Sequence, residues 1–104
     1  MDERMENEVR QNKAIRGYIM RALVKGHQNT LLVRQISNAL IADGLIISPD
    51  LSKYLDYLIE AGYVITTDKS ATAYNAYRKD GSIKLTKAGI DLVEGTIDDP
   101  GVDI

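Results

Sequence analysis

The chain contains no cysteine. Its absence excludes disulfide bonds, thiolate metal sites and cysteine nucleophiles, and it is compatible with a reducing compartment. The chain also lacks any run of about 18 apolar residues, the length that a membrane-spanning helix requires. Residues 2–8 are rich in acids, where a secretory signal peptide would be basic and then apolar. We therefore expect a soluble, cytoplasmic protein with no membrane association.

Histidine is nearly absent, because His27 is the single one. We expect this residue at the surface, and we expect neither a catalytic triad nor a pair of histidine metal ligands. No GxxxxGK loop is present to hold a phosphate. Asp56 and Glu60 share a helix face, but no third ligand stands at a recognisable spacing. The sequence therefore predicts no enzyme activity, no metal site and no cofactor.

Length and charge set the next bounds. With 104 residues and 44% apolar content, the chain is long enough for one core. We expect one domain over residues 1–95 and a loose, acidic tail over residues 96–104. The net charge of −2 weighs against a protein that depends on phosphate contacts. However, residues 10–25 carry five bases and no acid. This basic stripe is either a binding surface or simply the solvated side of a helix.

The segment from Ser48 to Gly62 has the strongest local pattern. Ser48 is a candidate N-cap, Pro49 suits the first helical position, and Gly62 is a stop signal. Apolar residues recur between them at a spacing of three and four, which predicts an amphipathic helix over 49–61. These residues are Leu51, Tyr54, Leu55, Leu58 and Ile59.

Two shorter segments precede this helix. Thr30 is a candidate cap for a helix from Leu31 to about Ala42, with Leu32, Ile36 and Leu40 directed inward. Residues 45–47 are apolar and prone to β structure, so we expect a small third strand there.

Strand patterns follow the helix over 49–61. Residues 63–67 and 82–85 predict two antiparallel strands joined by residues 68–81, a long wing. Whether residues 76–79 add a further strand segment stays open. Thr86 is then a candidate cap for a short helix over residues 87–94, which Gly95 ends.

The first helix, expected over residues 4–25, has two apolar lines. One contains Ile15, Tyr18, Ile19, Ala22 and Leu23. The second, weaker line is offset from it and runs through Met5, Val9, Arg16 and Met20. Because a helix with two apolar lines needs a second neighbour, we expect a homodimer whose interface is formed by Met5, Val9 and Met20.

Three segments are candidate DNA contacts. On the helix over 49–61, three carboxylates (Asp50, Asp56 and Glu60) stand among Ser52, Lys53 and Tyr57. Carboxylates repel phosphate unless they accept from a cytosine amino group, so this helix is equally consistent with a packing role. In the wing, Arg78 and Lys79 are candidates to grip phosphate, or they belong to a solvated turn. Arg34 is a further candidate for backbone contact.

The order helix, turn, helix, hairpin resembles the winged-helix superfamily of ArsR- and MarR-type bacterial regulators over about residues 15–94. The residues that carry this resemblance are Ile36, Leu40, Ser48, Leu51, Leu55, Leu58, Gly62-Tyr63-Val64 and Leu85-Thr86-Lys87-Ala88-Gly89. It implies an α+β, mainly α fold with a three-helix core, a β-hairpin wing, a long N-terminal helix and a short C-terminal helix. Recognition would then belong to Ser52, Lys53, Asp56 and Tyr57, and the wing role to Arg78 and Lys79.

The C-terminal part is more narrowly similar to a small winged-helix family of Mu-like phages and prophages. The residues concerned are Leu85-Thr86-Lys87-Ala88-Gly89-Ile90-Asp91-Leu92-Val93-Glu94-Gly95 and the closing Pro100-Gly101-Val102. The resemblance implies a prophage origin and a DNA-associated or assembly role, although this wing is longer than is usual in that family. Two hypotheses follow. The first is a dimeric protein that binds double-stranded DNA and regulates transcription. The second is a module that binds a phage or host protein without DNA affinity.

Overall fold

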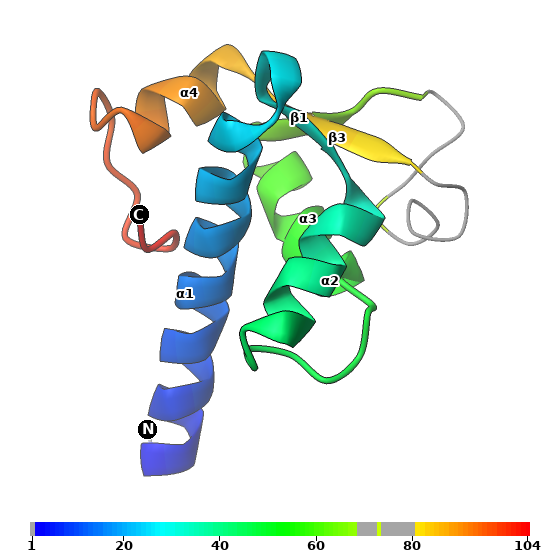
Figure 1. The fold of residues 1–104 in the computed structure, drawn as a ribbon. Helices are drawn as coiled ribbons and strands as arrows, with labels where there is room; N and C mark the ends of the chain where they lie inside the picture. Colours follow the sequence, from blue (N-terminus) through cyan, green and yellow to red (C-terminus); the bar gives the residue numbers. More distant parts are fainter. Residues whose placement is uncertain (1, 69–72, 74–80) are drawn as a thin grey trace.

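The structure, a computed structural model, describes residues 2–68, 73 and 81–104 (Figure 1). Over these residues it is an α+β, mainly helical fold with four helices and a small three-stranded antiparallel sheet. This architecture is compatible with a winged helix. The elements are α1 (Glu3–Lys25), a 3₁₀ turn (His27–Asn29), β1 (Thr30–Leu32), α2 (Val33–Ala42), α3 (Ser52–Glu60), β2 (Val64–Thr66), β3 (Ser82–Leu85) and α4 (Lys87–Val93).

Helix α1 is the longest element and confirms the expected helix over residues 4–25. The Asp2 side chain caps it by accepting a hydrogen bond from the Met5 N–H at 2.9 Å, and Gly26 follows its last residue. The C-terminal half of α1 is buried through Ile15, Ile19, Met20 and Leu23. Its first third, by contrast, is exposed throughout.

The start of α2 differs from the expectation. Thr30 does not cap a helix, because Thr30–Leu32 forms strand β1, which pairs antiparallel with β3. The helix starts at Val33, and the Leu32 N–H donates to Gln35 Oε1 at 2.9 Å. Leu32 is consequently exposed rather than directed inward. Residues 30–32 form a strand because they pair with β3, some fifty residues later in the chain (Thr30 with Lys84). No local sequence pattern indicates this pairing.

The third strand of the sheet was therefore expected in the wrong place. The sheet has the order β1-β3-β2. Residues 45–47, where we expected that strand, form no strand, and Ile47 is 98% exposed. The third strand is β1, which stands between α1 and α2 in the chain. The apolar residues 45–47, after α2, lie in a loop.

Helix α3 is shorter than the 49–61 that the sequence predicted. The N–H of Ser52 donates to Asp50 Oδ1 at 2.9 Å, whereas Ser48 Oγ accepts only from the Asp50 N–H in the loop before it, at 3.3 Å. The carbonyl of Pro49 accepts from the hydroxyl of buried Ser37 at 2.8 Å, which ties this loop to α2. Gly62 ends the segment with a φ of +83°, as its glycine predicted.

The hairpin expected after α3 is confirmed. Strand β2 pairs antiparallel with β3, with Val64 opposite Leu85 and Thr66 opposite Ile83. Val64, Ile83 and Leu85 are buried in the core, and Ile65 faces outward. The question of a strand segment over residues 76–79 lies outside the described residues.

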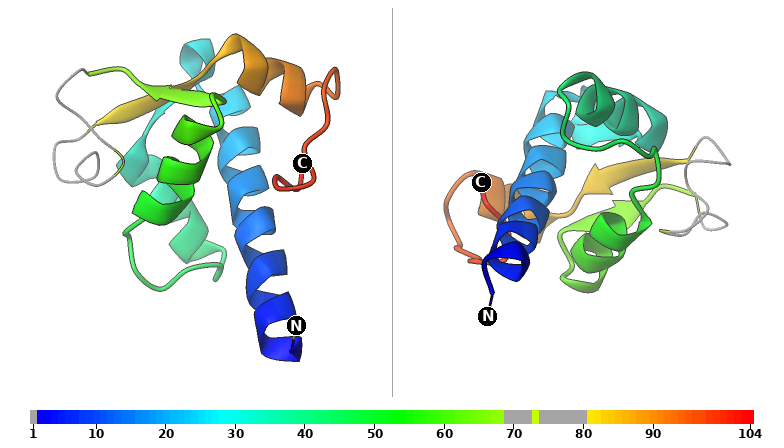
Figure 2. Two further views of the ribbon diagram at one scale, coloured as in Figure 1. Left: turned by 180° about the vertical axis from the view of Figure 1, so that it is seen from behind. Right: turned by 90° about the horizontal axis from the view of Figure 1, so that it is seen from below.

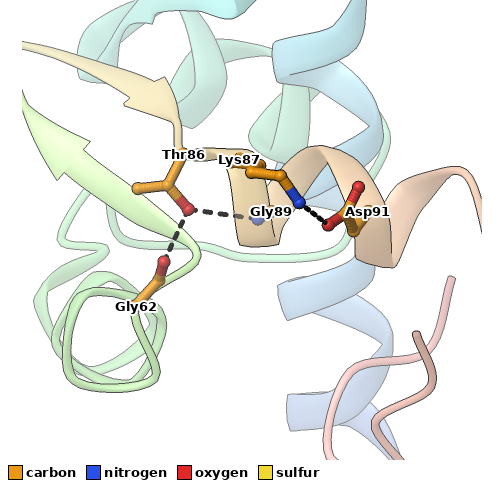
Figure 3. A network of polar contacts seen from close by, with 5 residues as sticks. All are labelled: Gly62, Thr86, Lys87, Gly89 and Asp91. Carbon is orange, nitrogen blue, oxygen red and sulfur yellow. Dashed lines mark hydrogen bonds and ion pairs between the residues drawn. The ribbon is translucent and has the colours of Figure 1, made fainter. Parts of the chain in front are cut away.

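Thr86 joins the hairpin to α4 and confirms the expected cap (Figure 3). Its hydroxyl donates to the Gly62 carbonyl at 2.5 Å and accepts from the Gly89 N–H at 3.1 Å. A Cβ on Gly89 would lie 2.2 Å from the Tyr63 carbonyl oxygen, so α4 approaches this backbone more closely than an alanine permits.

The tail that we expected to be loose is packed, which corrects that expectation. It runs along the side of α1 away from α2 (Figures 1 and 2). Val102 is 4% exposed and belongs to the core, and the Asp103 N–H donates to the Lys13 carbonyl at 3.1 Å. Its acidic composition predicted a solvent-exposed tail, but one buried valine, one backbone hydrogen bond to α1 and two hydrogen bonds from arginine side chains of α1 hold it in place. Among the described helices, none is long and apolar enough to cross a membrane.

Candidate nucleic-acid interface

The outer side of α3 carries several of the predicted recognition residues. Tyr54, Leu55 and Leu58 fasten the helix to the core. Lys53 and Glu60 are exposed, and Asp56 is half-buried. This helix leads directly into the hairpin, and both lie beside α1 (Figure 2). The predicted recognition residues Lys53 and Asp56 thus stand on a surface that the described chain leaves open.

Ser52 has a local role at the start of α3. Its hydroxyl donates to Asp50 Oδ1 at 2.5 Å, and its N–H donates to the same oxygen. A ligand that used the Ser52 hydroxyl would have to compete with this charge-assisted hydrogen bond. Ser52 therefore positions the helix start as well as being a candidate contact.

Tyr57 lies at a junction between α3, α1 and the tail. The guanidinium carbon of Arg16 stands 3.6 Å from the centre of the Tyr57 ring. Arg16 Nη1 also donates to the Gly101 carbonyl at 3.0 Å. One face of the Tyr57 ring is therefore covered by Arg16, and the residue as a whole is half-buried.

Arg16 is a structural residue that sequence reasoning missed. Its position on the first helix assigned it to the basic stripe over residues 10–25. Its contacts with Tyr57 and with the tail are evident only in the folded structure. Its Nε is buried and has no hydrogen-bond partner within the described part of the chain. Together with Lys53, Asp56, Tyr57, Glu60 and Ala61, Arg16 lines a shallow hollow of about 480 Å³.

A second unforeseen contact fixes the tail. The Tyr63 hydroxyl donates to Asp99 Oδ2 at 2.5 Å, and Asp99 Oδ1 accepts from the Gly101 N–H at 2.8 Å. The hydrogen bond to Asp99 raises the pKa of Tyr63 to about 12. The same bond, followed by the Gly101 N–H, lowers the pKa of the Asp99 carboxyl. No signal in the sequence pairs these two residues, which stand 36 positions apart.

The remaining predicted DNA contacts are on other elements. Arg34 is the second residue of α2 and is exposed. Arg78 and Lys79 lie outside the described residues, between β2 and β3 in the sequence. The structure therefore brings Ser52, Lys53 and Asp56 together on α3, and it places Arg34 on a separate helix.

The charge of the α3 surface is unfavourable for phosphate at close range. Asp50, Asp56 and Glu60 contribute three carboxylates, and Lys53 is the one cation among residues 50–60. The Asp50 carboxylate accepts two hydrogen bonds from Ser52, which partly stabilise its negative charge. If α3 approached DNA, its carboxylates would have to lie near base edges, where they can accept from a cytosine amino group. Cations on other elements would then have to contact the phosphates.

The predicted dimer interface is only partly available. Met20 is fully buried within its own chain, so its assignment to an interface was wrong. Helix α1 is covered by α3, by the sheet and by the tail, and its buried arc is consequently wider than one apolar line predicted. Met5 and Val9, at 51% and 38% exposure, do face solvent.

Comparison with known proteins adds no assignment. No family model, curated protein or solved structure matches this chain. Within residues 2–68, 73 and 81–104, no group of three or more histidine, aspartate or glutamate side chains is placed to hold a metal ion.

Proposed function

We propose that this protein binds double-stranded DNA, with α3 directed toward the major groove and the hairpin beside it. The observation that carries the proposal is the open outer side of α3, with exposed Lys53, immediately before the β2–β3 hairpin. A helix about 10–12 Å across fits the major groove, which is about 12 Å wide. With nine residues, α3 is about 13 Å long and presents roughly two turns to the groove.

The residues divide into two proposed roles. Lys53 would donate to a guanine edge, and Asp56 would accept from a cytosine amino group. Arg34, Arg78 and Lys79 would contact the phosphate backbone, which sets affinity without reading sequence. Ser52 and Tyr57 would hold the reading helix and offer secondary contacts. In this proposal the protein acts in the cytoplasm as a transcriptional regulator, as the resemblance to prophage winged-helix proteins implies.

A second candidate is a protein-binding module on the same scaffold. Two observations favour it: the three carboxylates on or beside α3, and Ile47 exposed at 98% in the loop before that helix. An acidic surface with an apolar residue at its edge suits a basic, partly apolar protein surface. In that case the protein would have this same fold but no affinity for DNA.

A salt titration distinguishes the two candidates. Binding of the full chain to a random-sequence duplex would be measured by fluorescence anisotropy between about 20 and 200 mM salt. Each neutralised phosphate contributes about −0.9 to the slope of log affinity against log salt. We expect the double variant Arg78→Ala/Lys79→Ala to lower the magnitude of this slope by roughly 1–2.

The matched control is Lys87→Ala, because Lys87 is on α4 and is paired with Asp91 at 2.8 Å. It should leave the slope unchanged. Failure of the unmodified chain to bind DNA even at the lowest salt would refute DNA binding and leave the protein-binding candidate.

A further inference from the structure

The first third of α1 is a helix surface without a neighbour. Gln11 marks its limit, because its side-chain amide donates to the Leu45 carbonyl at 3.2 Å. In the described part of the chain, no residue before Gln11 makes a hydrogen bond to another element. Met5 and Val9 stand one helical turn apart on this segment, and both are exposed. Figure 1 shows this part of α1 projecting past the ends of α2 and α3.

Charge is separated along the same helix. Residues 2–8 contain four acids (Asp2, Glu3, Glu6 and Glu8) and a single base. Residues 10–25 contain five bases and no acid. A helix with this polarity is complementary to a second copy of itself in the antiparallel orientation, since the acidic end of each copy would then lie beside the basic part of the other.

A hollow lies next to the basic part. It has a volume of about 600 Å³ and is bounded by α1, by the end of α4 and by the packed tail. Arg10 and Lys13 stand on its α1 side, Leu92, Ile97 and Val102 are among its apolar lining, and four acidic residues line it as well (Glu94, Asp98, Asp99 and Asp103). Neither basic side chain forms an ion pair within the described residues. The hollow therefore combines an apolar wall, which can take an apolar side chain of a second molecule, with charges of both signs.

We propose that two copies of this chain pair through antiparallel α1 helices, with the two-fold axis near Val9. On α1, Glu6, Val9 and Lys13 succeed one another at spacings of three and four, so they share one side of the helix. With the axis between Val9 and Arg10, Glu6 of each copy lies opposite Lys13 of the other. Val9 packs at the centre, and Met5 is carried toward the hollow of the second copy. This pairing differs from the one predicted from sequence, because it does not use Met20, and it is independent of DNA binding.

Sedimentation equilibrium of the full chain tests the pairing directly. The unmodified protein should be a dimer at micromolar concentrations, and Val9→Glu should be a monomer with an unchanged circular dichroism spectrum. The control is Asn7→Glu, which adds the same charge on the opposite side of the exposed segment and should remain dimeric. A monomeric unmodified protein at several hundred micromolar would overturn the proposal, and so would a fully dimeric Val9→Glu.

A charge exchange tests the antiparallel register. Glu6→Lys alone and Lys13→Glu alone should each weaken dimerisation by roughly tenfold, because each places like charges opposite one another. The double variant Glu6→Lys/Lys13→Glu should recover to within about threefold of the unmodified protein. Thermal unfolding of each variant identifies any that fails to fold, and an equimolar mixture of the two single variants should form mixed dimers. If the double variant is as weak as the sum of the single changes, the antiparallel register is wrong.

Discussion

Gly17, in the middle of α1, is predicted to be the residue on which tail packing depends. A Cβ built at this position lies 1.8 Å from the Asp103 carbonyl oxygen and 2.5 Å from its carbon. Both contacts are with backbone, so the tail must move if Gly17 is replaced by alanine. Movement would disturb the burial of Val102 and the hydrogen bond from Arg21 Nη1 to the Asp103 carbonyl.

Two opposing effects decide the size of the change. Burial of a valine contributes about 1.5–3 kcal/mol, and each tail hydrogen bond contributes about 0.5–1.5 kcal/mol. Partial loss of these terms gives a destabilisation of about 2–4 kcal/mol. Alanine in place of glycine within a helix stabilises by about 1 kcal/mol. We therefore expect Gly17→Ala to lower the free energy of unfolding by about 1–3 kcal/mol.

Urea denaturation followed by circular dichroism measures this change in two backgrounds. In a chain that ends at Asp98, the tail backbone is absent and only the helix effect remains. There Gly17→Ala should stabilise by about 1 kcal/mol, so the sign of the effect reverses. Asn7→Ala, at an exposed position of the same helix, should stabilise slightly and equally in both chains. If Gly17→Ala has the same sign in both, the tail does not pack on α1 as described.

Two further changes test other parts of the fold. Thr86→Ala should lower the free energy of unfolding by about 1–2 kcal/mol, because the Gly89 N–H loses its acceptor and the Gly62 carbonyl loses its donor. In the same urea assay, Thr86→Ser should stay within about 0.5 kcal/mol of the unmodified protein, because serine keeps the hydroxyl. Equal losses for the two variants would argue against the cap. For Tyr63, whose pKa rises from 10.0 to about 12 on folding, the neutral hydroxyl is the form that the fold favours. Its contribution to stability is complete below pH 10 and is lost as the pH rises from 10 toward 12, so the unmodified protein should lose more stability than Tyr63→Phe over that interval.

Local patterns predicted most of the helices and both strands of the hairpin. The spacing of apolar residues identified α1 and α3, and the threonine before Lys87 identified the cap of α4. These features depend on neighbours within four residues, and such interactions act in any context. The start of α2 was missed for the converse reason, since β1 exists only because β3 pairs with it.

The candidate site was predicted less completely than the fold. Sequence identified Lys53 and Asp56 as residues of one helix side, and the structure leaves that side open. It gave no indication that Arg16 would cover the Tyr57 ring or that Met20 would be enclosed. Both facts depend on which elements surround α1, and periodicity identifies an apolar side without saying how many neighbours cover it.

By itself, the order of residues determined the helices, the hairpin and the polarity of charge along α1, because these depend on short-range geometry and composition. The tertiary structure alone decided that the acidic tail is packed and that the third strand precedes α2. Both are contacts between segments far apart in the chain. The tail is held by one buried valine, by a backbone hydrogen bond to α1 and by two glycines (Gly17 and Gly101) that permit close approach, whereas β1 is held by its backbone pairing with β3. None of these contacts leaves a periodic signal.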